Sequence, residues 1–157
     1  MQKIATCLWF DGKAEEAAKF YTGIFPDSRI RETMLHGEAG PGPADSVLTV
    51  TFELLGSEYI ALNGGPNFSF TPAISIFVKC ETQDEIDRYW DKLLDGGSPM
   101  ACGWLTDRFG VSWQIAPRKL LGMLQDEDKA KAARTMQMMR TMIKLDIAAL
   151  EKAYRGE

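Results

Sequence analysis

The chain contains a single histidine, His36, and this bounds the chemistry available to it. A metal site built from several histidines is excluded, and any acid–base step carried by histidine rests on this one residue. His36 precedes the segment 37–45, which contains Gly-Pro-Gly-Pro and is predicted to be a flexible loop. If the loop closes over a cavity, His36 is a candidate general base; a solvated loop histidine is the alternative.

The three cysteines indicate neither a disulfide framework nor a zinc knuckle. Cys7, Cys80 and Cys102 are odd in number, widely spaced and include no Cys-x-x-Cys pair. We expect them to be small buried side chains, because free cysteine behaves as a small apolar residue. This cysteine usage favours a reducing compartment, so we expect a cytoplasmic protein.

The composition is typical of a globular protein. The chain has 157 residues, 45% hydrophobic and 25% charged, which predicts one compact domain. No stretch approaches the roughly 20 apolar residues of a membrane span, and the first residues turn polar too soon for a signal peptide. The net charge of -4 repels phosphate backbones and anionic lipids, so we expect neither nucleic acid nor a membrane as a partner.

The spacing of apolar residues predicts a strand, a helix and three more strands in the first part of the chain. A strand is expected at 4–10, and Asp11-Gly12 follows it as a turn. A helix follows, with apolar residues three and four apart from Ala14 to Phe25, and it ends before Pro26. The remaining strands are expected at 29–35, 47–54 and 58–63, the last two as a hairpin.

After Gly64-Gly65-Pro66 the same order begins again. A strand is expected at 73–79, and a capping box follows in which Thr82 and Glu85 satisfy each other's free amides. The helix that starts there has one apolar face and ends at Gly96-Gly97. Short strands are expected at 100–104 and 111–116, and everything after Pro117 is predicted to be helical.

A shift of 69 residues places the segment 4–10 over 73–79, and Phe20-Tyr21 over Tyr89-Trp90. Two copies, each with a complete set of strands and a helix, indicate an internal duplication. We therefore predict one α+β domain made of two tandem βαβββ modules, residues 1–68 and 69–117. A helical C-terminal extension, residues 118–157, lies outside the repeat.

Five segments carry a resemblance to a known family. They are LWFDGKAEEAAKFY (Leu8 to Tyr21), ALNGGPNF (Ala61 to Phe68), CETQDEIDRYWDKLLDGG (Cys80 to Gly97), CGWLTDRFGVSWQIAP (Cys102 to Pro117) and KLDIAALEKAY (Lys144 to Tyr154). With them the chain resembles the PhnB-like, or demethylubiquinone methyltransferase-like, group of the vicinal oxygen chelate superfamily, which includes glyoxalases, extradiol dioxygenases and antibiotic resistance proteins. The resemblance implies a curved eight-stranded mixed sheet around a central cavity, with helices on its convex side, and a homodimer.

The resemblance also implies where metal ligands would stand, one on each of four inward-facing strands. The positions fall on Thr6, on Tyr59 (or Ala61 or Asn63), on Ser75 (or Ala73), and on Gln114. None of them supplies a histidine or a carboxylate, whereas a divalent metal normally takes at least three such ligands. We therefore expect no metal; a metal-dependent lyase or dioxygenase would need ligands from His36 or from loop carboxylates.

The methyltransferase label of the group implies S-adenosylmethionine. The common doubly wound class of such enzymes needs a glycine-rich turn after the first strand. Asp11-Gly12 and Cys80-Glu81 occupy the two strand–helix junctions instead. We expect no cofactor, and a transferase stays open as an alternative.

The candidate site residues are neutral. Thr6, Ser75 and Gln114 have the same predicted inward-facing parity, and hydroxyls with one amide can orient a small polar ligand. Pairing with each other or with buried water is the alternative. Trp104 is expected to border the cavity, while Trp9, Trp90 and Trp113 are expected in the core. The leading hypothesis is a metal-free, cofactor-free protein that binds an unidentified small organic molecule; whether it also acts on that molecule is open.

Overall fold

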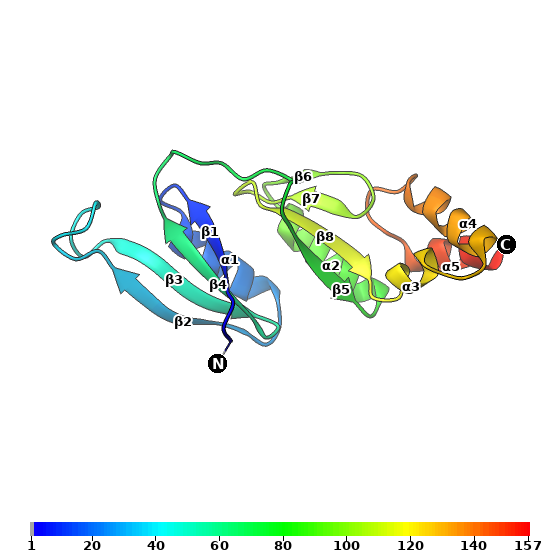
Figure 1. Cartoon of the computed structure of the whole chain (residues 1–157), viewed down its shortest axis with the longest axis horizontal. Coiled ribbons are helices and arrows are strands. Elements are labelled where there is room, and N and C mark those ends of the chain that lie inside the picture. Colours follow the sequence, from blue (N-terminus) through cyan, green and yellow to red (C-terminus); the bar gives the residue numbers. More distant parts are fainter. Residues whose placement is uncertain (1) are drawn as a thin grey trace. The chain divides into compact units, whose positions relative to one another are not determined.

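The structure, a computed structural model, describes residues 2–157. The chain forms two compact units, and the boundary between them in the sequence lies between residues 70 and 71. Each unit contains a four-stranded mixed sheet and a helix that follows its first strand (Figure 1). The strand order is β1-β4-β3-β2 in the first unit and β5-β8-β7-β6 in the second, and neither sheet is closed. The α+β class and the tandem βαβββ order are confirmed, with the eight strands divided between two sheets.

The first unit packs one helix on one face of its sheet. Its elements are β1 (Thr6–Phe10), α1 (Ala14–Ile24), β2 (Ser28–Leu35), β3 (Val47–Leu54) and β4 (Ser57–Asn63). Strand β1 pairs parallel with β4, whereas β2 forms an exposed edge. The Tyr21 ring of α1 stacks 6.1 Å from Phe52, which stacks 5.4 Å from Tyr59, so these side chains share the helix-covered face. Alternating residues along the strands therefore face α1 or face away from it.

The second unit repeats this plan. Its elements are β5 (Ser75–Cys80), α2 (Gln83–Leu94), β6 (Ser98–Pro99), β7 (Trp104–Thr106) and β8 (Ser112–Pro117). Helix α2 buries Trp90 and Leu93, and the sheet buries Val78, Leu105 and Trp113. Leu105 is the cross-strand neighbour of Trp113, and Val78 is that of Ile115, two residues further along β8, so all of them lie on the face that α2 covers.

The predicted capping box at the start of α2 is half confirmed. The Thr82 hydroxyl accepts the Glu85 N–H at 3.2 Å, as expected. The Glu85 carboxylate, however, accepts the N–H of Glu81 at 3.3 Å rather than that of Thr82. The predicted end of the helix is confirmed: α2 ends at Leu94, and Gly96 adopts a left-handed conformation with φ of +82°.

The prediction of a strand at 100–104 is wrong. Cys102 and Gly103 both adopt left-handed conformations, with φ of 62° and 82°. Two such residues in succession turn the chain and cannot continue an extended strand. The turn separates β6, which precedes the predicted range, from β7, which begins at Trp104.

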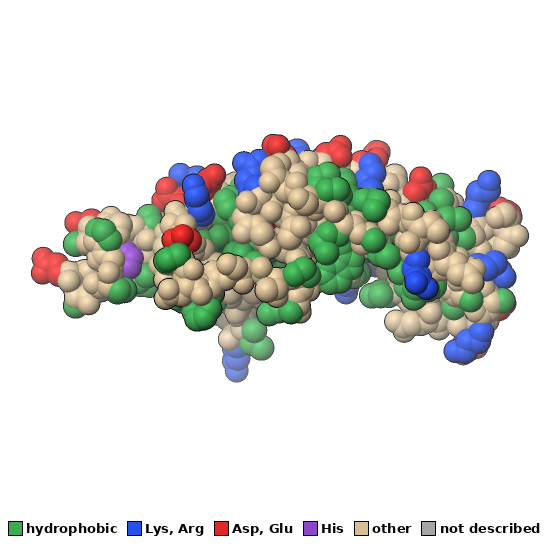
Figure 2. All heavy atoms as spheres, turned by 90° about the horizontal axis from the view of Figure 1, so that it is seen from above, with side chains coloured by type: hydrophobic (Ala, Val, Ile, Leu, Met, Phe, Trp, Pro, Cys, Tyr) green, Lys and Arg blue, Asp and Glu red, His purple; other side chains and the backbone are tan. Residues whose placement is uncertain are grey.

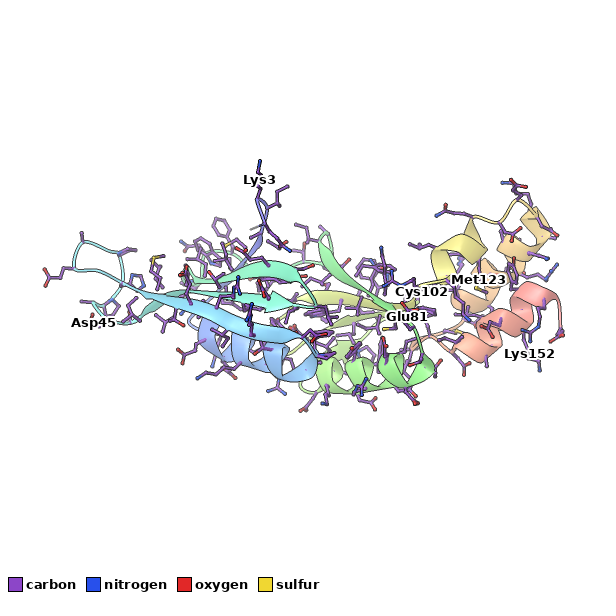
Figure 3. All side chains as sticks on the ribbon, turned by 90° about the horizontal axis from the view of Figure 1, so that it is seen from below. Lys3, Asp45, Glu81, Cys102, Met123 and Lys152 are labelled. Atoms are coloured by element: carbon purple, nitrogen blue, oxygen red, sulfur yellow. The ribbon has the colours of Figure 1, made fainter. Side chains whose placement is uncertain are left out.

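The C-terminal extension belongs to the second unit and forms three helices, α3 (Leu120–Leu124), α4 (Lys129–Met139) and α5 (Ile147–Arg155). The expectation of a helix throughout is wrong between α4 and α5. There the carbonyls of Met142 and Ile143 accept the N–H groups of Cys102 and Gly103 at 2.9 and 2.8 Å, so that segment docks on the turn before β7 (Figure 3). No helix among residues 2–157 is long and apolar enough to cross a membrane.

The extension has its own small apolar cluster. It consists of Ala116, Leu120, Leu145 and Leu150, with Met123, Leu124, Met138, Met139 and Met142 packed against it. Unbranched methionine side chains fill the irregular spaces between short helices well. Met138, Met139 and Met142 pack against this cluster, whereas Met136 is 40% exposed.

The Gln83 side chain joins α2 to the extension, and its removal should destabilise the protein. Its Nε2 donates to the Leu145 carbonyl at 3.1 Å, and its Oε1 accepts the Ile147 N–H at 2.8 Å. Gln83→Ala leaves both backbone groups without this partner, so we expect a loss of about 1–3 kcal/mol in the free energy of unfolding, measured in urea. The same change at the exposed Gln125 is the control, and equal stabilities of the two variants would contradict this role.

Candidate functional site

The two modules repeat with different offsets in their helices and in their first strands. The buried Tyr21 of α1 corresponds to the buried Trp90 of α2, an offset of 69 residues. The buried Leu8 of β1 corresponds to the buried Val78 of β5, an offset of 70. A slip of one residue turns every side chain of a strand to the other face. A uniform shift of 69 gives Thr6 of β1 and Ser75 of β5 the same face, whereas in the structure Thr6 lies on the helix-covered face and Ser75 on the opposite one.

Three of the predicted site residues lie on the face that α1 covers. Thr6 is the cross-strand neighbour of Tyr59, which is part of the aromatic stack against α1. Asn63 uses both ends of its amide inside the unit: Oδ1 accepts the Ala14 N–H at 2.9 Å, and Nδ2 donates to the Val47 carbonyl at 3.1 Å. Asn63 thus accepts a hydrogen bond from the first N–H of α1, a role that the sequence pattern did not indicate.

Three other candidates are brought together on the second sheet, on the face that α2 does not cover. The Gln114 amide is 2.9 Å from the Ser75 hydroxyl, with Nε2 as the donor. Trp104 is the cross-strand neighbour of Gln114 and points to the same face. All three side chains are partly exposed, so this group, the Ser75–Gln114–Trp104 site, is the candidate functional site.

A row of hydroxyl groups borders this site. Ser75, Ser112, Thr106 and Ser98 are successive cross-strand neighbours on β5, β8, β7 and β6. Ser112 is 1% exposed, and its Oγ has no hydrogen-bond partner among the described residues. Sequence analysis missed Ser112, although its position two residues before Gln114 on one strand places both on the same face.

Asp107 holds the strand that carries Gln114. It is buried; its Oδ1 accepts the N–H groups of Phe109 and Val111 at 2.8 and 3.0 Å, and its Oδ2 accepts the Trp113 indole N–H at 2.9 Å. Asp107 therefore caps backbone amides of the turn. The bond to Trp113 also fixes the adjacent residue of β8, and with it the direction of Gln114.

His36 is enclosed by its own loop. Its N–H donates to the Ser46 carbonyl at 2.7 Å, and its carbonyl accepts the Asp45 N–H at 3.0 Å, so the loop is closed at its base. A Cβ at Gly42 would lie 2.6 Å from His36 Nε2, and Nδ1 is buried without a hydrogen-bond partner among the described residues. Figure 3 shows Asp45 beyond the ends of β2 and β3. The general-base hypothesis stays a prediction that requires the loop to release the ring.

The cysteines differ in their surroundings. Cys80 is buried, and its pKa is raised to about 12 by burial and by the nearby carboxylates of Glu85 and Glu81. Cys102 is partly buried, whereas Cys7 is exposed on the face of β1 that α1 does not cover. The expectation of three buried cysteines is therefore wrong for Cys7.

The mapped ligand positions do not fit a divalent metal. Ser75 and Gln114 bond to each other, and both polar ends of the Asn63 amide are engaged with the backbone. Hydroxyls and amides without carboxylates or imidazoles are also weak donors for zinc, iron or manganese. Within residues 2–157, no group of three or more histidines, cysteines, aspartates and glutamates is placed to hold a metal ion.

At each strand–helix junction a side chain already bonds one of the N–H groups that a cofactor carboxylate could use. A helix N-terminus binds anions through its free backbone N–H groups. At α1 the Ala14 N–H is bonded to Asn63, and at α2 the Glu85 N–H is bonded to Thr82. The mixed sheets also lack the parallel, doubly wound order in which such turns hold S-adenosylmethionine.

Two grooves flank α5 in the extension, with volumes of about 450 and 460 Å³. They are lined by Arg134, Gln137, Met138, Thr141, Ala153, Gly156 and Glu157, and by Lys119, Gly122, Met123, Glu151, Tyr154 and Arg155. The predicted site residues are absent from both linings, so the grooves are separate from the candidate site.

In comparison with known proteins, residues 2–116 match the sequence model of the 3-demethylubiquinone-9 3-methyltransferase family. A PhnB protein from Bacillus cereus is 42% identical, with a TM-score of 0.67, over 73% of this chain and 99% of that chain. The protein PA1353 from Pseudomonas aeruginosa is 22% identical, with a TM-score of 0.62, over 74% of this chain and 98% of that chain.

The fold also extends to more distant structures. The fosfomycin resistance protein FosX from Listeria monocytogenes is 12% identical, with a TM-score of 0.50, over 72% of this chain and 89% of that chain. No curated protein matches the chain. The family match ends at residue 116, so the segment 144–154, which contributed to the sequence resemblance, lies outside it.

Removal of the Ser112 hydroxyl should stabilise the unliganded protein. A buried hydroxyl without a partner costs about 1–3 kcal/mol, so Ser112→Ala should raise the free energy of unfolding by about 1 kcal/mol in urea. Thr135 is the matched control, because its buried hydroxyl donates to the Lys131 carbonyl at 2.9 Å and Thr135→Val should lower stability. A loss of stability in Ser112→Ala would show that the hydroxyl has a structural partner.

Proposed function

The chain belongs to the 3-demethylubiquinone-9 3-methyltransferase (PhnB-like) family of the vicinal oxygen chelate superfamily, and from that premise we propose that it binds a small organic molecule at the Ser75–Gln114–Trp104 site. The ligand is held by neutral hydrogen bonds and by contact with an aromatic ring. Neither a metal ion nor a cofactor takes part in this binding.

The hydrogen bond between Gln114 and Ser75 is the observation that carries the proposal. It links β8 and β5 on the face opposite α2, and it fixes two polar side chains in one orientation. Trp104 adds a large apolar surface beside Gln114. Pre-oriented polar groups next to an aromatic ring are the usual composition of a small-molecule site.

The site also rests on a rigid support. Asp107 holds the turn between β7 and β8, and the Trp113 indole fixes the strand from the opposite face. Side chains on anchored strands lose little freedom when a ligand binds, which favours binding. An enzyme of the superfamily, either a transferase or a metal-dependent lyase or dioxygenase, is the alternative that the same binding experiments test.

We also propose that two copies of the chain form a homodimer. Large apolar side chains are exposed in both units, and Figure 2 shows hydrophobic side chains reaching the surface over much of the molecule. The most exposed are Ile4, Phe68 and Ile74, with exposed fractions of 86%, 66% and 76%. Burial of such side chains against a second copy would remove apolar surface from water.

Ligand binding at the site should change the fluorescence of Trp104. We expect an aromatic carbonyl compound from a fragment panel to alter tryptophan emission in the wild-type protein and in Trp90→Phe, whose residue is buried against the other face of the sheet. Trp104→Phe should lose the response. A response that persists in Trp104→Phe would place the ligand elsewhere, and a melting temperature raised by S-adenosylmethionine or by a divalent metal would favour an enzyme.

Sedimentation equilibrium should give twice the chain mass of 17.5 kDa. Replacement of Ile74 and Phe68 by serine should shift the equilibrium towards the monomer, because both changes remove exposed apolar surface. The control is Ile143→Ser, a matched change at a side chain that is 51% exposed in the extension. A wild-type mass of 17.5 kDa at tens of micromolar protein would contradict the dimer.

A further inference from the structure

The hydrogen bond between Gln114 and Ser75 leaves at least one donor and one acceptor side by side, because the second N–H of Gln114 Nε2 also stays available. Gln114 Nε2 donates to Ser75 Oγ, so the Ser75 hydroxyl hydrogen is free to donate to another group. The Gln114 Oε1 atom is a carbonyl-type acceptor and makes no hydrogen bond among the described residues. A ligand that meets this pair therefore finds a donor beside an acceptor.

This pattern does not depend on which way the amide of Gln114 is oriented. If Oε1 and Nε2 exchange places, Oε1 accepts from the Ser75 hydroxyl, and the NH₂ group becomes the free donor. The oxygen lone pairs of Ser75 then become the free acceptor. In both orientations the pair presents at least one donor beside an acceptor, so the complementary ligand group is the same.

The two cross-strand rows that contain the pair are neutral, and the charged side chain that the strands bring to this face is the exposed Lys79, one row further along β5. The row through Ser75 contains Ser112, Thr106 and Ser98, and the row through Gln114 contains Phe77 and Trp104. Neither row contains a charged side chain that would compensate a carboxylate or a phosphate. An anion at the pair would also meet the lone pairs of an acceptor, which repel it.

The aromatic ring of Trp104 adds a requirement of shape. As the cross-strand neighbour of Gln114, it stands on the same face within the distance at which side chains of adjacent strands touch. A flat ring that reaches the donor and acceptor can lie against the indole, and such contacts favour planar molecules.

We propose that the ligand is neutral and planar and carries a lactam-type group, in which an N–H stands next to a C=O. The N–H donates to the acceptor of the pair, the C=O accepts from its donor, and the ring packs on Trp104. This inference deepens the proposed function and rests on it, because it assigns a ligand chemistry to the same site.

Three probes of nearly equal size test the inference. Isoquinolin-1(2H)-one is a planar lactam, its N-methyl derivative lacks only the donor, and 1-naphthoate is a planar anion. Each is titrated into the full-length ¹⁵N-labelled protein, and the shifts of the Trp104 indole N–H and the Gln114 side-chain amide are followed. We expect the lactam to bind at least about fivefold more tightly than either of the other probes, since one hydrogen bond is lost in each.

A variant of Gln114 with a side chain of similar volume separates binding at this face from recognition of the lactam by the Gln114–Ser75 pair. Gln114→Leu should bind the lactam about five- to tenfold more weakly and should bind the two neutral probes equally, because the pair no longer exists. Gln125→Leu, the same change at an exposed residue, should behave as the wild type. In Gln114→Leu the Trp104 signal alone reports binding.

The outcomes are distinguishable. If the lactam and its N-methyl derivative shift the Trp104 signal with equal affinity in the wild type, the lactam inference is overturned while binding at this face stands. Tighter binding of 1-naphthoate also overturns it. If millimolar concentrations of all three probes leave the Trp104 and Gln114 signals unchanged, the proposed function itself fails.

Discussion

The packing of one helix against one face of each four-stranded sheet is the constraint on which the rest of the structure depends. In the first unit, Tyr21 of α1 presses on Phe52, and in the second unit Trp90 and Trp113 are buried between α2 and the sheet. Because side chains alternate along a strand, this burial decides which residues remain on the other face. Because its neighbours Trp113 and Ile115 are buried in the core, the side chain of Gln114 lies on the uncovered face, where a ligand can reach it.

Single polar side chains then secure the places where the elements meet. Asn63 serves the start of α1, Gln83 joins α2 to the C-terminal extension, and Asp107 holds the turn before β8. Each of them satisfies backbone groups that would otherwise lose hydrogen bonds on folding. Ser112 is the contrast, a buried hydroxyl without a partner among the described residues. It lies beside the candidate site, where unfavourable local energy is often retained for function.

Family membership and local chemistry give complementary information. Residues 2–116 place the chain in its family, and the distant fold similarity extends to a fosfomycin resistance protein. At the mapped ligand positions, Ser75 and Gln114 are nevertheless bonded to each other, and Asn63 is bonded to the backbone. A fold supports different chemistry when the residues on its strands change. The proposed function therefore rests on Gln114, Ser75 and Trp104 rather than on the name of the family.

The sequence by itself determined the order of elements, because apolar periodicity, Pro26 and the Thr82 cap are local signals. It also indicated Ser75 and Gln114 through a common predicted parity, and Trp104 as a residue that borders the cavity. Tertiary structure decided the rest. The first strands of the two modules correspond at an offset of 70 and the helices at 69, so a uniform shift of 69 assigned Thr6 to the wrong face. The break between α4 and α5 arises from backbone bonds to Cys102 and Gly103, which are distant in the sequence and invisible to local patterns.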